Sequence, residues 1–79
     1  MVTMRAKMKV TSVELFEVGE KIKMSAVCKN YYPADGSDED NTYAKWTPSA
    51  TLEMYISNPD LAGKVKPGQK FYVDFTEAE

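Results

Sequence analysis

The 79-residue sequence contains no histidine and only one cysteine, Cys28. These absences exclude His-based catalysis, an intrachain disulfide and the usual zinc sites, which are built from several cysteines and histidines. The four glycines stand far apart, so the sequence has no glycine-rich loop for binding phosphate. We therefore expect a protein that is not an enzyme and that uses no metal ion or cofactor.

Long apolar runs and a large excess of one charge are also missing. No stretch approaches the roughly 20 apolar residues of a membrane-spanning helix, and residues 1–10 alternate lysine with methionine instead of forming a signal-peptide core. Ten basic and twelve acidic residues leave a net charge of −2, which gives no overall attraction to nucleic acid or to an anionic membrane. We expect an intracellular protein with no membrane partner, and nucleic acid is a disfavoured partner.

What is present is the composition of a small folded domain. The chain is 43% hydrophobic and 28% charged, which is typical of globular proteins and not of disordered ones. Residues 1–79 suffice for one domain only, and a domain of this size has a thin core that a partner subunit would help to cover.

An alternation of apolar and polar residues predicts antiparallel β-strands. Apolar residues take the even positions over 4–10 and the odd positions over 13–15, so we expect a β-bulge near Thr11 and Ser12. Gly19 supplies the turn into a second strand. This second strand covers residues 21–29, and the later predicted strands cover residues 42–46, 50–57 and 71–76.

The connections complete the prediction of the fold. Residues 58–63 suit a single helical turn, with Leu61 and Val65 covering one end of the core. Residues 31–41 are rich in acids and turn formers and predict an exposed loop, and residues 77–79 form an acidic tail. The expected fold class is all-β: a small bent β-barrel or sandwich of four to five mostly antiparallel strands with one short helical turn.

Aromatic residues are the first candidates for binding, because several occupy positions expected to face outward. Outward aromatics either stack on bases, as in barrels that bind nucleic acid, or form cross-strand pairs and protein interfaces. We favour cross-strand pairs or an interface over base stacking, and we expect copies of the chain to meet through the sheet face that carries Tyr55 and Tyr72 or through a strand edge. The candidate residues are Tyr31, Tyr32, Tyr43, Trp46, Tyr55 and Tyr72.

Basic residues are the second candidates, because they gather on the outward parity of the first hairpin and could form a positive face. Such a face could hold a phosphate backbone or an acidic partner, including the acidic loop of another copy. Alternatively, the lysines only discourage unwanted pairing at strand edges. These residues are Arg5, Lys7, Lys9, Lys21, Lys23 and Lys29.

The acidic loop and the cysteine offer weaker signals. The loop oxygens are of the kind that Ca²⁺ prefers, but their spacing does not match an EF-hand, so a solvated loop without metal is the favoured interpretation. Cys28 falls on the inward parity and is expected to be a small buried hydrophobic residue. The loop residues concerned are Asp35, Asp38, Glu39, Asp40 and Asn41.

Several segments together resemble a family of small tailed-bacteriophage proteins of unassigned activity. The similarity covers nearly the whole chain from Met4 onward and implies that Met1 to Thr3 are an extension. It also implies a phage origin and a setting in the infected bacterial cytoplasm or in the virion, but it supplies no site residue. The segments that carry the resemblance are 25–29, 32–42, 46–50, 58–59, 67–68 and 71–76.

Two main hypotheses of function follow. The first is a non-catalytic phage-encoded binding or structural protein, such as a virion accessory protein, that contacts itself as a homo-oligomer and a phage or host protein. The second is a host-takeover or anti-defence factor that binds a bacterial protein or sequesters a nucleotide signal. A third, less favoured hypothesis is an OB-like protein that binds single-stranded nucleic acid.

Overall fold

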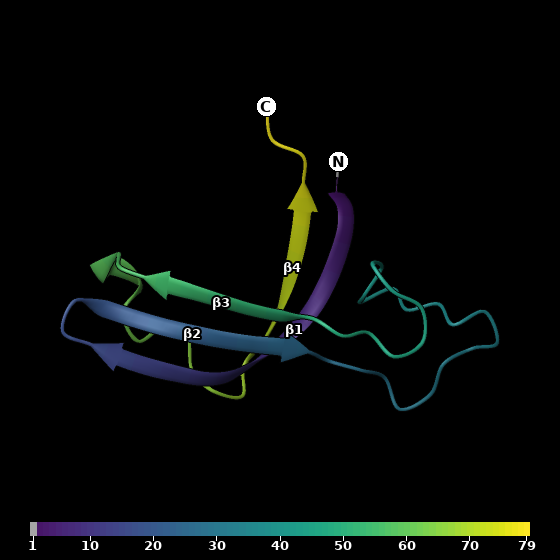
Figure 1. Cartoon of the computed structure of the whole chain (residues 1–79), viewed down its shortest axis with the longest axis horizontal. Coiled ribbons are helices and arrows are strands. Elements are labelled where there is room, and N and C mark those ends of the chain that lie inside the picture. Colours follow the sequence, from purple (N-terminus) through teal and green to yellow (C-terminus); the bar gives the residue numbers. More distant parts are fainter. Residues whose placement is uncertain (1) are drawn as a thin grey trace.

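Residues 2–79 are described by the structure, a computed structural model, and Met1 lies outside the described residues. The chain forms one antiparallel sheet with the strand order β3-β2-β1-β4 (Figure 1). The all-β prediction, with one short helical turn, is therefore confirmed, and the sheet is bent and open instead of closed into a barrel. The elements are β1 (Val2–Phe16), β2 (Gly19–Ala26), β3 (Thr51–Ile56), the 3-10 turn η1 (Pro59–Leu61) and β4 (Lys70–Thr76).

Strand β1 is long and bends in its middle. Its register with β2 shifts between Val10 and Ser12, which confirms the predicted bulge around Thr11. β1 pairs with β4 over residues 2–9 and with β2 over residues 8–16, so it has both neighbours just before the bend, and β2 in turn pairs with β3. The sheet therefore has two wings that run in different directions (Figure 1).

The core lies on the inner face of the sheet, where the predicted alternation places the apolar side chains of β1 and β2. Half-buried side chains from β3, β4 and the long connections pack against this core, among them Tyr43 and Val65. Among residues 2–79, the buried hydrophobic residues are Ala6, Met8, Val10, Ile22 and Met24. With so few buried residues, the core is as thin as the chain length implies.

Three local predictions are wrong. Residues 42–46 form turns instead of a strand, and Trp46 has a left-handed backbone with φ of 57°. Cys28 is exposed, because β2 ends at Ala26 and the strand alternation no longer sets the direction of its side chain. Of the two residues expected to cover one end of the core, Val65 packs against it, whereas Leu61 is exposed.

Among residues 2–79, none of the helical segments has the length and apolar character required to traverse a lipid bilayer.

Candidate binding surfaces

Arg5 and Asp74 face each other across β1 and β4 on the outer face of the sheet. The Arg5 Nε atom lies 2.6 Å from Asp74 Oδ1, and Nη2 lies 3.0 Å from Oδ2, so the two groups form a bidentate pair. The hydrogen bond from Arg5 holds the pKa of the Asp74 carboxyl below its usual value. The guanidinium also lies 4.5 Å from the ring centre of Tyr72.

The acidic loop extends this network over the same face. The Tyr72 hydroxyl donates to Asp40 Oδ1 at 2.9 Å, and this hydrogen bond raises the pKa of the Tyr72 hydroxyl. Lys7 Nζ lies 3.5 Å from the other oxygen of Asp40. The loop therefore meets the basic residues of its own chain, where the sequence had pointed to a second copy.

A second cluster occupies the other wing. Lys21 Nζ lies 3.9 Å from Glu14 and 3.5 Å from Glu53, and 5.6 Å from the ring centre of Tyr55. The Tyr55 ring in turn packs on Phe16, with their ring centres 6.0 Å apart. Tyr55 therefore has an aromatic partner within its own chain, but that partner is Phe16 and not another of the candidate tyrosines.

These contacts turn the predicted positive face into a surface of mixed charge. Lys29 belongs to the same surface and is also paired with acidic residues: its Nζ atom lies 3.0 Å from Glu39 and 3.8 Å from Asp38. Of the six basic residues in question, only Lys9 and Lys23 form no ion pair with a described residue.

The remaining predicted aromatics lie along the connection between β2 and β3 and have different surroundings. Tyr31 is exposed, and the Tyr32 hydroxyl accepts a hydrogen bond from the Lys29 N–H at 3.0 Å. Trp46 is half exposed and lies against Gly36, whereas Tyr43 packs against the core. The buried Tyr43 hydroxyl has no hydrogen-bond partner among the described residues. The aromatics therefore do not form one continuous stacking surface.

Asn41 fastens the acidic loop to the edge of β1, a role that the sequence analysis missed. Its side chain is fully buried: Oδ1 accepts from the Lys7 N–H at 2.8 Å, and Nδ2 donates to the Val27 carbonyl at 2.9 Å and to Asp38 Oδ2 at 3.1 Å. Beside it, Thr42 exchanges two hydrogen bonds with the Arg5 backbone. The loop thus satisfies the part of the β1 edge that β2 is too short to cover.

Asp38 supports this attachment from inside the loop, which is therefore only partly exposed. Burial raises the pKa of the Asp38 carboxyl, but hydrogen bonds from the Asn41 side chain and the Asp40 N–H, with the charge of Lys29, outweigh it, so the pKa lies below the usual value. The sequence signal for this arrangement is an aspartate three residues before an asparagine, a pattern typical of local side-chain to backbone turns.

A lowered pKa at Asp38 predicts a loss of stability in acid. The stabilisation is complete above the pKa of an unfolded aspartate, about 3.9, and is lost as the pH falls through the folded-state pKa. Urea unfolding between pH 2 and 6 should show a midpoint that falls in acid for the wild type. Asp38→Asn should lower the midpoint at neutral pH and flatten this dependence, whereas an unchanged acid slope would contradict the role of Asp38.

The inner face of the sheet is incompletely covered. Met54 and Phe75 lie on this face opposite their cross-strand neighbours Ile22 and Met4, but they are 50% and 45% exposed. Phe71, on the same face, is 38% exposed. Between the wings lies an apolar groove of about 260 Å³, whose lining includes Leu52, Val73 and Phe75.

The dimensions of the molecule agree with an uncovered face. Its surface of 5887 Å² exceeds by about 1,100 Å² the value of about 4,800 Å² expected for a compact monomer of this size. Its radius of gyration is 14.4 Å, against about 11.6 Å for a compact chain of this length.

The chain matches no protein-family model, and no curated protein or solved structure is significantly similar to it. Within residues 2–79, no group of three or more acidic or cysteine side chains is placed to hold a metal ion.

Proposed function

We propose that this protein is a non-catalytic binding or structural subunit that acts through protein–protein contacts, beginning with contacts to a second copy of itself. The open inner face of the sheet is the observation that carries the proposal. A soluble sheet buries one face against another layer, and here only the 27–50 and 57–69 connections supply such a layer.

Area and charge both suit a second copy as the occupant of this face. A standard interface buries about 800 Å² on each partner, which is close to the surplus surface of this chain. Two copies facing each other through a two-fold axis would form a β-sandwich, with their sheets about 10 Å apart. A net charge of only −2 gives little repulsion between copies.

The contact we propose differs from the one expected from the sequence. Tyr72 and Tyr55 lie on the outer face, where Asp40, Arg5, Lys21 and Phe16 already engage them. Covering the inner face would remove the exposed apolar side chains of Met54 and of the β4 phenylalanines from water, so it should stabilise a dimer more than covering the outer face.

Adjacent residues on β3 allow a matched test. Met54→Glu places a charge on the inner face, and Tyr55→Glu places the same charge on the outer face. We expect light scattering to give the mass of a dimer for the wild type and for Tyr55→Glu, and the mass of a monomer for Met54→Glu. A monomeric wild type at several hundred micromolar, or dissociation by Tyr55→Glu alone, would contradict self-association through the inner face.

The resemblance to small tailed-phage proteins favours a virion as the setting for this function. Mass spectrometry of purified virions from a phage that encodes the chain should then detect it at a fixed copy number. Its absence from particles, together with expression early in infection, would count against a virion accessory protein and in favour of a host-binding factor.

A further inference from the structure

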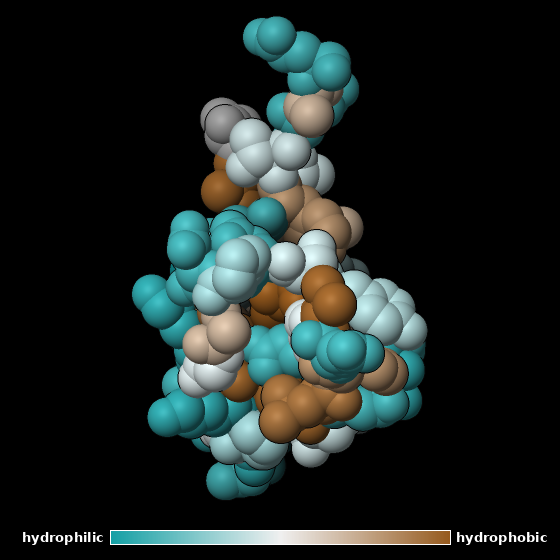
Figure 2. Space-filling view, turned by 90° about the vertical axis from the view of Figure 1, so that its left-hand side faces the viewer, coloured by the Kyte–Doolittle hydropathy of each residue, from teal (hydrophilic) through white to brown (hydrophobic). Residues whose placement is uncertain are grey.

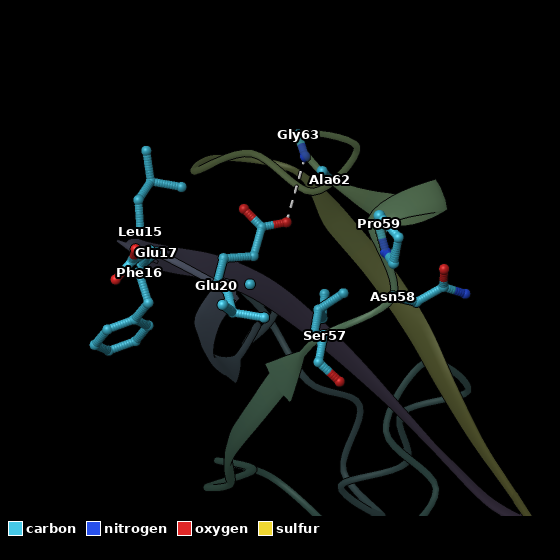
Figure 3. Close-up of a pocket in the computed structure, with 12 residues that line it drawn as sticks. Leu15, Phe16, Glu17, Glu20, Ser57, Asn58, Pro59, Ala62 and Gly63 are labelled. Carbon is cyan, nitrogen blue, oxygen red and sulfur yellow. Dashed lines mark hydrogen bonds between the residues drawn. The ribbon is translucent and has the colours of Figure 1, made fainter.

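The β1–β2 hairpin and the turn η1 enclose a pocket of about 460 Å³ at one end of the sheet (Figure 3). Its walls are mostly apolar and include Leu15, Ile56, Pro59 and Ala62. A view onto this side of the molecule shows apolar surface gathered between polar residues (Figure 2). The volume lies within the range of about 300–1,000 Å³ that is typical of pockets for small ligands.

Glu20 is the unusual residue of this pocket. It lies on the inner face between its cross-strand neighbours Leu15 and Ile56, at a position where the alternation of β2 calls for an apolar side chain. It is only 4% exposed. A glutamate at such a position is rarely retained without a partner for its charge.

The carboxylate of Glu20 has little to compensate it within the chain. One oxygen, Oε1, accepts a long hydrogen bond of 3.4 Å from the Gly63 N–H, and no ion pair joins Glu20 to a described residue. The other oxygen points away from Gly63, toward the side of the pocket where Leu15 lies (Figure 3). A buried carboxylate without a cation is costly, so a cation placed here would recover free energy.

We infer that this pocket binds a primary ammonium group carried on an apolar stem. A single protein carboxylate is too few ligands for Ca²⁺ or Mg²⁺. A guanidinium prefers both oxygens of a carboxylate, but one of them already faces the Gly63 N–H, which leaves a site for the point charge of an ammonium. The apolar walls would cover the stem. Met54, the residue that tests self-association, does not line this pocket, so the two proposals are tested at different residues.

The test is an NMR titration of the intact chain with hexylammonium chloride, using hexanol as the uncharged probe with the same stem. Hexylammonium should shift the Glu20 and Gly63 amide resonances saturably, and hexanol should bind at least about tenfold more weakly, because it lacks the charge-assisted hydrogen bond. Equal binding of both probes, or no saturable shift at these amides, would overturn the inference without any variant.

Two variants assign the effect to one carboxylate. Glu20→Gln keeps the shape of the side chain and should weaken hexylammonium binding about tenfold while leaving hexanol binding unchanged. Glu17→Gln removes an exposed charge that lines the same pocket and should have little effect. An equal loss in both variants would overturn the specific role of Glu20. Repeating the titration with Nα-acetyl-lysine methylamide distinguishes a protein lysine from a free amine as the source of the ammonium.

Discussion

Asn41→Ala should lower the free energy of unfolding by about 3–5 kcal/mol, since it leaves three buried or half-buried partners without their hydrogen bonds, at about 1–3 kcal/mol each. Those partners are the Lys7 N–H, the Val27 carbonyl and the Asp38 carboxylate. A domain of this length has a total stability of about 4–12 kcal/mol. The variant should therefore be close to unfolded, or should at least release the acidic loop from β1.

Urea unfolding gives the free energy, and hydrogen exchange at the Lys7 amide reports the attachment of the loop directly. Asn30→Ala is the matched control, because Asn30 lies in the same connection and is exposed. That control should change stability by no more than about 0.5 kcal/mol. If Asn41→Ala cost as little as Asn30→Ala, or left exchange at Lys7 unchanged, the loop would not depend on this amide.

The strands were predictable because they depend on short-range alternation. The even-to-odd change of apolar positions around Thr11 indicated the bulge before any partner strand was known, and the pairing of β1 and β2 confirms it. The failure at residues 42–46 has a different cause. Asn41 and Thr42 bond to the backbone of β1 more than thirty residues earlier, and no local pattern records such a partner.

The surfaces were harder to predict than the fold for a similar reason. The parity of a residue along a strand identifies its face, and Arg5, Lys7 and Lys21 do lie opposite the core. Parity does not say what the chain itself lays over that face. Asp74 and Asp40, which come from distant segments, form ion pairs with Arg5 and Lys7. The surface that still lacks contacts is therefore the apolar inner face of the sheet.

The burial of Glu20 was also not predicted from the sequence. In the sequence it reads as one more polar residue of the Glu17-Val18-Gly19-Glu20 turn. The register shows that β2 has already begun at Gly19, which places the carboxylate on the inner face beneath the segment that follows η1. The alternation of Ile22 and Met24, continued back by two residues, places Glu20 on the inner face, but only the register shows that the strand extends that far.

Gly19→Ala should also destabilise the protein strongly, with an expected cost of about 3 kcal/mol or more. Gly19 has φ of +105°, and a Cβ atom added there would lie 2.5 Å from the Ile56 carbonyl oxygen and 3.2 Å from the Ser57 Cα. The left-handed backbone alone costs an alanine about 1–2 kcal/mol. The remaining cost arises because the clash is with backbone, so no side-chain rotation relieves it and the end of β3 must move away from β2.

Gly68→Ala separates these two contributions. Gly68 has φ of +93°, close to that of Gly19, but no heavy atom lies within 4 Å of an added Cβ. It should therefore show the backbone cost alone, about 1–2 kcal/mol, and Gly19→Ala should exceed it clearly in urea unfolding. In Gly19→Ala, hydrogen exchange should also quicken at the Glu20–Ile56 end of the β2–β3 pair, because the sheet opens there first. Equal losses in the two variants would mean that the sheet absorbs the clash, and that the close approach of Gly19 to Ile56 does not fix the position of β3.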